Sequence, residues 1–287
     1  MKLVHLKVGG QVHLGIKTEQ GLFDVSKIAA KYRMDAPVSI DQVIAEGEKS
    51  LLQLTELMKK TRDPIPEKTI HYAPAVLGPE KIICVGLNYS SHSEECKTEL
   101  PTSPVLFNKF NNALAAHQEI IHLPKSAEKF DYEAELVIVI GKEAKDVAKE
   151  DALSYVFGYT VGNDLSARDL QFRTGQWLLG KTCDQFAPIG PYVVTSDEID
   201  PSNLNIECQV NGVVRQSANT RDLIFDVATI VSYISKHFTL KPGDIIFSGT
   251  PGGVILGYPE AEQHWLKAGD KITVSIQNIG SLTNTLA

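Results

Sequence analysis

Hydrophobic and polar positions follow two different periods in the first sixty residues. Up to about residue 18 apolar and polar side chains alternate around a turn at Gly9-Gly10, which predicts a pair of strands. Residues 24–31 and 39–60 carry apolar side chains in helical rhythm, and Asp41 can cap the second helix. The Asp63-Pro-Ile-Pro66 stretch breaks this pattern. We therefore expect a small N-terminal α+β module in residues 1–70 and a main domain in residues 71–287.

Beyond residue 70 the chain consists mostly of short apolar segments separated by turn signals. Candidate strands lie at residues 81–86, 105–109, 136–140, 156–161, 192–195, 205–210, 213–216, 244–248 and 271–276. Candidate helices lie at residues 90–97, 149–154 and 226–237, with another starting near 166. Many short strands with few helices predict an α+β, mainly β fold, with a mixed, barrel-like β-roll as the main domain.

The most informative stretch is DYEAELVIVIG, residues 131–141, where two glutamates precede a run of apolar and largely β-branched residues. Side chains two apart on a strand point to the same face, so Glu133 and Glu135 should project together. Adjacent carboxylates repel each other unless one is protonated or a cation lies between them. An all-oxygen site for Mg²⁺ or Mn²⁺ explains the pair. The alternative is one solvated glutamate and one that pairs with a lysine.

A third carboxylate, Asp164, follows an apolar segment that ends at Gly162. At the end of a neighbouring strand Asp164 could meet Glu133 and Glu135 and complete a three-carboxylate metal site. Its alternative role is to cap the helix that follows.

That following helix carries Arg168 and Gln171, which could together bind a substrate carboxylate. Arg168 could equally form an ion pair with Asp169 or Glu135. The sequence leaves both possibilities open.

A candidate base lies upstream, in a short polar segment where His92 and Glu95 are three residues apart. On a helix the two would share a face, and the carboxylate could orient the imidazole for proton transfer. The same spacing also occurs in solvated surface pairs.

Two glycine-containing loops offer further polar groups. Residues 175–182, GQWLLGKT, match the phosphate-loop pattern, but no apolar strand precedes them and two prolines follow, so we reject a nucleotide site. Lys181 in this loop could neutralise a developing negative charge. Residues 248–253 follow a predicted strand and present the Thr250 hydroxyl to a ligand, or form an ordinary tight turn.

Composition limits the possible partners. The 287 residues carry a net charge of -7 without a block of Lys and Arg, which argues against nucleic acid or an anionic membrane as partner. No apolar run has the length of a membrane span, and the start lacks the apolar core of a signal peptide, so we expect a cytoplasmic protein. The four cysteines are widely spaced, which predicts neither a zinc site nor a disulfide framework.

Several of these segments, taken in order, resemble the fumarylacetoacetate hydrolase family, from about residue 81 to 274. They are GLNYSSHSEE, DYEAELVIVIGK, GYTVGNDLSARDLQ, GKTCDQFAPIGP, the NG hairpin followed by NTRDLIFD, and KPGDIIFSGTPGGV. The resemblance implies a homodimeric enzyme with a β-roll core and a Mg²⁺ or Mn²⁺ ion. The implied roles are metal binding by Glu133, Glu135 and Asp164, proton transfer by His92 with Glu95, electrostatic stabilisation by Lys181, and substrate contacts from Arg168, Gln171 and Thr250.

One departure narrows the resemblance to a branch of the family. The tyrosine-catabolic hydrolases have a further metal-binding Asp where this chain offers Asn88 and Tyr89. This difference favours the smaller bacterial-type branch, which includes acylpyruvate hydrolases, oxaloacetate decarboxylases and hydroxymuconate or heptadienedioate isomerases.

The activities of that branch share a substrate type, a 2-oxo or 1,3-diketo acid that chelates the ion and passes through an enolate. The first hypothesis is hydrolysis of a C–C bond in acylpyruvates. The alternative is oxaloacetate decarboxylation or isomerisation of 2-hydroxyhepta-2,4-diene-1,7-dioate or 5-carboxymethyl-2-hydroxymuconate on the same site. A third, non-enzymatic hypothesis is a binding protein for small dicarboxylates, which would not need His92, Glu95 and Lys181.

Overall fold

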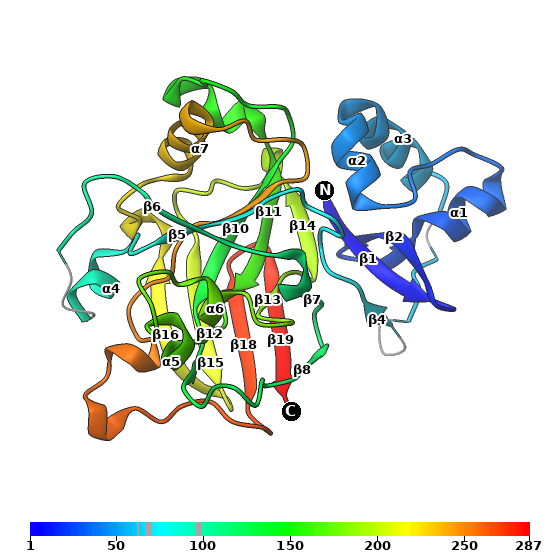
Figure 1. Cartoon of the computed structure of the whole chain (residues 1–287). Helices are drawn as coiled ribbons and strands as arrows, with labels where there is room; N and C mark the ends of the chain where they lie inside the picture. Colours follow the sequence, from blue (N-terminus) through cyan, green and yellow to red (C-terminus); the bar gives the residue numbers. More distant parts are fainter. Residues whose placement is uncertain (62, 67–69, 96–98) are drawn as a thin grey trace.

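Two β-sheets organise the protein (Figure 1). The computed structural model describes residues 1–61, 63–66, 70–95 and 99–287. The larger sheet has the order β3-β2-β1-β14-β11-β10-β17-β5-β6, with β4 paired to β1. Its strands are β1 (Lys2–Val8), β2 (Gln11–Thr18), β3 (Gly21–Asp24), β4 (His71–Tyr72), β5 (Ile82–Gly86), β6 (Val105–Lys109), β10 (Ala134–Ile140), β11 (Val156–Asn163), β14 (Tyr192–Thr195) and β17 (Ile245–Phe247).

The second sheet has the order β16-β15-β18-β19-β8. Its strands are β8 (Ile120–Ile121), β15 (Asn205–Val210), β16 (Val213–Asn219), β18 (Lys271–Ile276) and β19 (Gly280–Leu286). Two short pairs complete the β-structure, β7 (Leu114–Ala115) with β13 (Ala187–Pro188) and β9 (Phe130–Asp131) with β12 (Ser166–Ala167). The mainly β fold is confirmed, as several sheets that do not close into a barrel.

Helices are short and few in the part of the chain that the structure describes. The α-helices are α1 (Val25–Tyr32), α2 (Ile40–Glu46), α3 (Glu48–Met58), α4 (Ser90–Glu95), α5 (Arg168–Gln171), α6 (Leu178–Lys181) and α7 (Val227–His237). Single 3₁₀ turns or short 3₁₀ helices lie at Asn111–Ala113, Lys149–Tyr155, Ser196–Glu198, Thr220–Asp222, Ile255–Gly257 and Glu260–Glu262.

Strand β10 lies at the centre of the core because it is buried on both faces. Leu136, Ile138 and Ile140 pack into the cluster between the two sheets, where the apolar face of α7 also lies. Val137 and Val139, on the opposite face, join a cluster that includes side chains of the N-terminal strands and helices. A continuous β-branched run is typical of such a doubly covered strand.

The N-terminal segment is continuous with the larger sheet. β1 pairs antiparallel with β14, with Leu3 opposite Val193. Leu3 and Leu14 belong to the same apolar cluster as Val137. The division of the chain at residue 70 stays a prediction.

Several sequence-based boundaries were wrong in detail. The single helix expected over residues 39–60 is two helices, because Gly47 adopts a positive φ of 59° between them. Ser39, not Asp41, caps α2, while the Asp41 carboxylate accepts the Leu77 N–H. The helix expected from residue 166 begins at Arg168, since residues 166–167 pair with β9.

One predicted helix extends beyond the described residues, and one strand of the structure was not predicted. The helix expected over residues 90–97 is α4, and residues 96–98 lie outside the described residues. The last strand, β19, was missed because GSLTNTL is too polar to mark a strand by hydrophobic alternation alone.

Candidate active site

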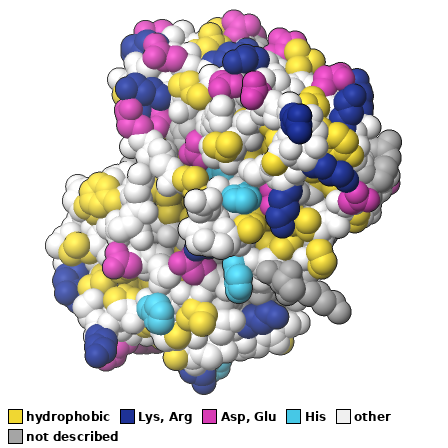
Figure 2. Space-filling model, turned by 90° about the vertical axis from the view of Figure 1, so that its right-hand side faces the viewer, with side chains coloured by type: hydrophobic (Ala, Val, Ile, Leu, Met, Phe, Trp, Pro, Cys, Tyr) yellow, Lys and Arg dark blue, Asp and Glu magenta, His cyan; other side chains and the backbone are white. Residues whose placement is uncertain are grey.

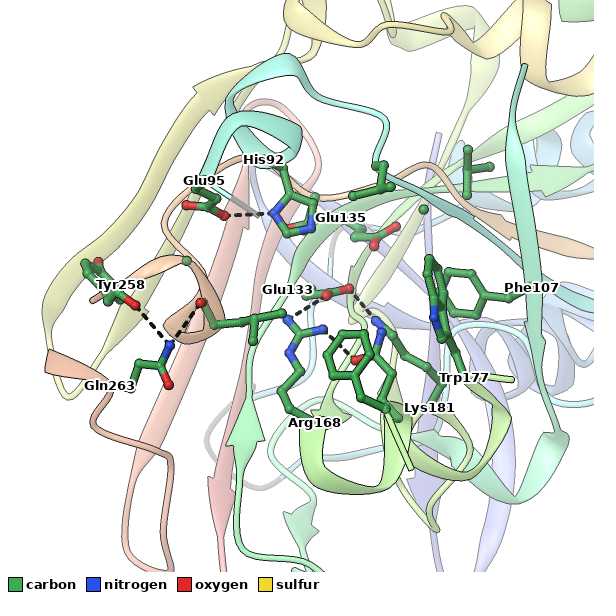
Figure 3. Close-up of a pocket in the computed structure, with 18 of the residues that line it drawn as sticks. His92, Glu95, Phe107, Glu133, Glu135, Arg168, Trp177, Lys181, Tyr258 and Gln263 are labelled. Carbon is green, nitrogen blue, oxygen red and sulfur yellow. Dashed lines mark hydrogen bonds and ion pairs between the residues drawn. The ribbon is translucent and has the colours of Figure 1, made fainter. Parts of the chain in front are cut away.

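The candidate site lies in a cavity of about 670 Å³ beside the ends of β10, β5 and β6 (Figure 3). All the predicted site residues line it except Asp164, which lies directly behind Glu133 and Lys181. The other lining residues are mostly apolar: Val85, Gly86, Leu87, Phe107, Phe172, Trp177, Leu256, Gly257, Tyr258, Pro259, Glu260 and Gln263.

The three predicted carboxylates converge at one end of this cavity. Glu133 precedes β10, Glu135 lies within it, and Asp164 follows β11. The antiparallel register places Asn163 opposite Ala134, and the Asp164 N–H donates to the Glu133 carbonyl at 2.9 Å. One carboxylate oxygen from each acid lies within 4.8 Å of the others, and all three side chains are buried. Asp164 does not cap the next helix, because its carboxylate contacts lysines instead.

Lys181 bridges two of the carboxylates. Its Nζ lies 2.7 Å from Glu133 Oε2 and 3.0 Å from Asp164 Oδ2. The short helix α6 carries Lys181 close to the chain at α5, because a Cβ at Gly180 would lie 2.4 Å from the Ala167 carbonyl oxygen. Burial lowers the pKa of Lys181, but the negative charges of Asp164 and Glu133 together raise it by more. The pKa of Lys181 therefore lies above its ordinary value. The ammonium is therefore charged at neutral pH.

Lys109 is a buried cation that the sequence analysis missed. At the end of β6 its Nζ lies 2.5 Å from Asp164 Oδ1 and donates to the carbonyls of Leu165 and Phe186 at 2.9 and 2.6 Å. A lysine closing the apolar segment VLFNK was the available signal, since a fully buried lysine requires a partner.

Arg168 contacts Glu133 on the side away from Lys181 and also binds a fourth carboxylate, that of Asp131. It contacts Asp131 Oδ2 through Nε at 2.9 Å, Glu133 Oε1 through Nη2 at 2.8 Å, and Gln171 Oε1 through Nη1 at 2.9 Å. Of the two possibilities left open for Arg168, the ion pair with Asp169 or Glu135 is replaced in the structure by ion pairs with Asp131 and Glu133. Asp131 was missed, although its spacing of two from Glu133 repeats that of the recognised pair.

Glu135 differs from its neighbours because no cation among the described residues forms an ion pair with it. One carboxylate oxygen accepts the Gly249 N–H at 2.6 Å. Burial, then Asp164 and Glu133, raise the pKa of Glu135 well above its usual range. Burial also raises the pKa of Glu133, but Lys181 and Arg168 outweigh this and hold it below its usual range. Glu135 is therefore the carboxyl group of the cluster whose charged form the surrounding protein stabilises least.

This arrangement fits a hard divalent cation. Four buried carboxylates, those of Asp131 and the three predicted ligands, face three cations. An ionised carboxylate offers about four acceptor positions, so the ion pairs leave oxygen positions for a metal. An all-oxygen set, of which Glu133 and Glu135 line the cavity, suits Mg²⁺ or Mn²⁺.

The predicted base lies opposite the carboxylates, on α4. His92 Nδ1 lies 2.8 Å from Glu95 Oε1, and the ring points towards the carboxylate group (Figure 3). Because a carboxylate oxygen accepts hydrogen bonds, we assign the ring proton to Nδ1, and proton transfer would then involve Nε2. Glu95 Oε2 in turn accepts the Gly253 N–H at 2.7 Å.

The remaining lining residues define the wall of the cavity. Trp177 packs edge-on against Phe107 with ring centroids 5.3 Å apart, and Lys181 Nζ lies 5.0 Å from the centre of the Phe107 ring. Thr250 Oγ1 accepts a hydrogen bond from Gln216 at 2.8 Å.

The phosphate-loop pattern at residues 175–182 does not have the geometry of a phosphate loop, since α6 follows helix α5 rather than a strand.

Comparison with known proteins places the chain in a family. Residues 81–287 match the family model described as fumarylacetoacetate (FAA) hydrolase C-terminal. The chain belongs to the fumarylacetoacetate hydrolase family, as the resemblance of its segments predicted.

Individual relatives carry several different names. A fumarylacetoacetate hydrolase domain-containing protein 2 homolog of Dictyostelium discoideum is 50% identical over 74% of this chain and 73% of its own. A mitochondrial oxaloacetate tautomerase of Rattus norvegicus is 40% identical over 86% of this chain and 79% of its own. The crystal structure of maleylpyruvate hydrolase from Sphingobium sp. SYK-6 in complex with manganese(II) and pyruvate matches this structure with a TM-score of 0.82. The two chains are 28% identical, and the match covers 100% of this chain and 99% of the hydrolase.

Two further features concern the distribution of charge on the surface and the length of the helices. On the face shown in Figure 2, Lys and Arg side chains are interspersed with Asp and Glu. None of the helices in the described residues has the length and apolar character needed to span a bilayer.

Proposed function

We propose that this protein is a divalent-metal-dependent enzyme that interconverts the keto and enol forms of 2-oxo acids of the oxaloacetate type. The observation that carries the proposal is the convergence of three buried carboxylates and an oriented histidine on one cavity. The name of the rat relative supports tautomerisation over the hydrolytic hypothesis, because its identity to this chain exceeds that of the maleylpyruvate hydrolase.

Glu133, Glu135 and Asp164 would hold Mg²⁺ or Mn²⁺ at the end of the cavity. Once bound, the ion supplies Lewis-acid stabilisation of negative charge on the substrate oxygens. The chain itself places a base, a hydrogen-bond donor and a dry, largely apolar wall around the same space.

His92 would take a proton from the carbon next to the substrate carbonyl through Nε2, while Glu95 stabilises the resulting imidazolium. Lys181, charged and buried, would donate to the oxygen that gains negative charge. Return of the proton from His92 to that oxygen completes the conversion of ketone to enol without change of mass. Arg168, Gln171 and Thr250 are proposed to orient the substrate.

Hydrolysis of acylpyruvates is the second candidate, and the size of the cavity favours it. At about 670 Å³ the cavity offers more room than a four-carbon acid needs, and Phe107 and Trp177 give it an apolar wall. In this reaction His92 would deprotonate a water that attacks the distal carbonyl; the C–C bond to the pyruvate part then breaks, releasing a carboxylic acid and the enolate of pyruvate, which takes up a proton.

Product analysis separates these reactions and the decarboxylation that was also considered. The purified protein is incubated with oxaloacetate, fumarylpyruvate and a series of acylpyruvates in Mg²⁺ or Mn²⁺, then with chelator. Tautomerisation changes the enol absorbance at constant mass, hydrolysis gives a new carboxylic acid, and decarboxylation releases CO₂. The proposal would be contradicted if none of these substrates were turned over in a metal-dependent way.

Substitution of the base provides a second test. We expect His92→Ala to lower kcat by about 100-fold or more, the range typical of general acid–base groups. His122→Ala, an exposed histidine outside the cavity, is the matched control. Full turnover by His92→Ala would exclude His92 as the base.

Assembly and location stay predictions of the sequence. A homodimer predicts twice the mass of the chain in light scattering. The cytoplasmic location is tested by fractionation of the source cell, and the mitochondrial name of the rat relative makes that organelle the alternative.

A further inference from the structure

The loop after β17, residues 249–258, lines part of the cavity, and its backbone contacts Glu95, the hydrogen-bond partner of the candidate base His92. The Gly253 N–H donates to Glu95 Oε2 at 2.7 Å, while Glu95 Oε1 faces His92 Nδ1. The carboxylate of Glu95 thus lies between the imidazole and a backbone amide. Its orientation, and that of His92, depends on where the loop holds Gly253.

The fit between Glu95 and this loop is close. A Cβ at Gly257 would lie 2.5 Å from Glu95 Cδ, and a Cβ at Gly252 would lie 3.3 Å from Glu95 Oε2. Glu95 therefore packs on bare backbone at both positions. A shift of the loop by a fraction of an ångström would move the carboxylate with it.

Two residues of the segment that precedes Glu133 hold this loop in place. The hydroxyl of Tyr132 donates to the Gly253 carbonyl at 2.8 Å. The carboxylate of Asp131 accepts the N–H groups of Ile255 and Leu256 at 2.8 and 3.0 Å. Asp131 and Tyr132 are both buried, and they immediately precede Glu133 in the chain.

Asp131 has a second function in the same network, because it also binds Arg168 at 2.9 Å. One carboxylate therefore holds both the loop and the guanidinium that contacts Glu133. Tyr132 has the simpler role, since its hydroxyl makes one hydrogen bond to the loop in the described structure.

We propose that Tyr132 and Asp131 are positioning residues that act through Gly253 and Glu95 to orient His92. Neither residue lines the cavity with the predicted site groups, so neither is a catalytic residue. The inference rests on the proposed role of His92 as base. It adds a physical link from the segment that leads into Glu133 and Glu135, two of the proposed metal ligands, to the helix that carries the proposed base.

Tyr132→Phe is the most selective test because it removes one hydroxyl and keeps the ring. We expect kcat to fall about tenfold, with KM and Mn²⁺ affinity changed less than twofold, because loss of one hydrogen bond relaxes the orientation of the base only. The Nδ1–H proton resonance of His92 should shift or broaden in parallel. Tyr159→Phe, at a tyrosine buried in the core away from the cavity, should change none of these quantities.

A double-mutant cycle tests the route through Glu95. If Tyr132 acts through that carboxylate, Tyr132→Phe should cost no further activity in a Glu95→Ala background. Additive losses, an unchanged His92 resonance in Tyr132→Phe, or equal losses of Mn²⁺ affinity and kcat would overturn the inference. If the parent protein turns over no 2-oxo acid, the proposed function fails, and the His92 resonance alone then decides whether Tyr132 positions the ring.

Discussion

Two regions of this protein bury polar side chains in opposite ways. At the candidate site charged groups predominate, with Lys109, Arg168 and Lys181 paired to carboxylates beside an open cavity. In the N-terminal segment the fully buried His5 makes neutral hydrogen bonds. It faces the Pro74 carbonyl at 2.9 Å and accepts the Ile40 N–H at 2.7 Å.

The difference separates structural polarity from functional polarity. Burial lowers the pKa of His5 even though Pro74 and Asp41 oppose the shift, so its ring is neutral and completes the start of α2. Buried charge is far more costly than a buried neutral hydrogen bond and is kept where a ligand or reaction needs it. The N-terminal network therefore serves the fold, whereas we expect the charged network to serve the proposed reaction.

The largest effect on stability is expected for Lys109→Met at the charged network. This change leaves Asp164 with one cation fewer and two carbonyls without their donor, and should lower the unfolding free energy by about 3–5 kcal/mol. Denaturant titration measures it, with Lys142→Met at an exposed lysine as control. A loss below about 1 kcal/mol would show that the pair contributes no more than a surface ion pair.

Glu135→Gln should separate function from stability most clearly. Glu135 forms no ion pair with the described residues, and replacing its carboxylate should weaken Mn²⁺ binding by more than about 100-fold, since even outer-shell substitutions cost 10- to 100-fold. In chelator the thermal midpoint should stay the same or rise, because no ion pair is lost. Calorimetric titration and thermal unfolding measure the two effects, with the exposed Glu143→Gln as control. Unchanged Mn²⁺ affinity would exclude Glu135 as a ligand.

His5→Leu tests the other side of the comparison. It leaves the Ile40 N–H and the Pro74 carbonyl without their partner, which should cost about 2 kcal/mol of unfolding free energy. Mn²⁺ affinity and the turnover per folded molecule should not change. The exposed His71→Leu is the matched control. A selective loss of Mn²⁺ affinity in His5→Leu would mean that the two networks are coupled.

The smallest effect concerns the pH dependence of stability and His117, a histidine outside both networks. Burial lowers the pKa of His117 to about 4, its Nδ1 accepts the Thr283 N–H, and its ring packs edge-on against Tyr72. Because the unfolded histidine titrates near 6.5, the unfolded state binds more protons between about pH 6.5 and 4. The contribution of neutral His117 to the stability of the folded state is therefore complete above pH 6.5 and is lost as the pH falls towards 4.

We expect this contribution to amount to about 1 kcal/mol between pH 7 and 5, after allowance for solvent screening of a half-buried ring. His117→Gln should reduce the pH dependence of the unfolding free energy by that amount. Identical pH dependence in the two proteins would show that His117 titrates in the folded state as in the unfolded state.

Much of this contrast could be predicted from sequence because it depends on local patterns. Glu133 and Glu135 are two positions apart, which predicted their common face, and His92 and Glu95 are three positions apart, which predicted their contact on a helix turn. Lys109 and Asp131 escaped prediction because each forms its contacts across strands that are distant in the chain. The break of the second helix at Gly47 was missed because apolar spacing continues across it.

The sequence alone determined the mainly β character of the fold and the residue types of the site, because side-chain periodicity and carboxylate chemistry are local properties. Tertiary structure decided which charges neutralise which: the register of β10 against β11 brings Asp164 to Glu133, and β6 delivers Lys109 to the same group. That register depends on the packing of whole strands, and no short segment of sequence encodes it. Only the folded chain therefore shows that Glu135 is the carboxylate without a cation partner among the described residues.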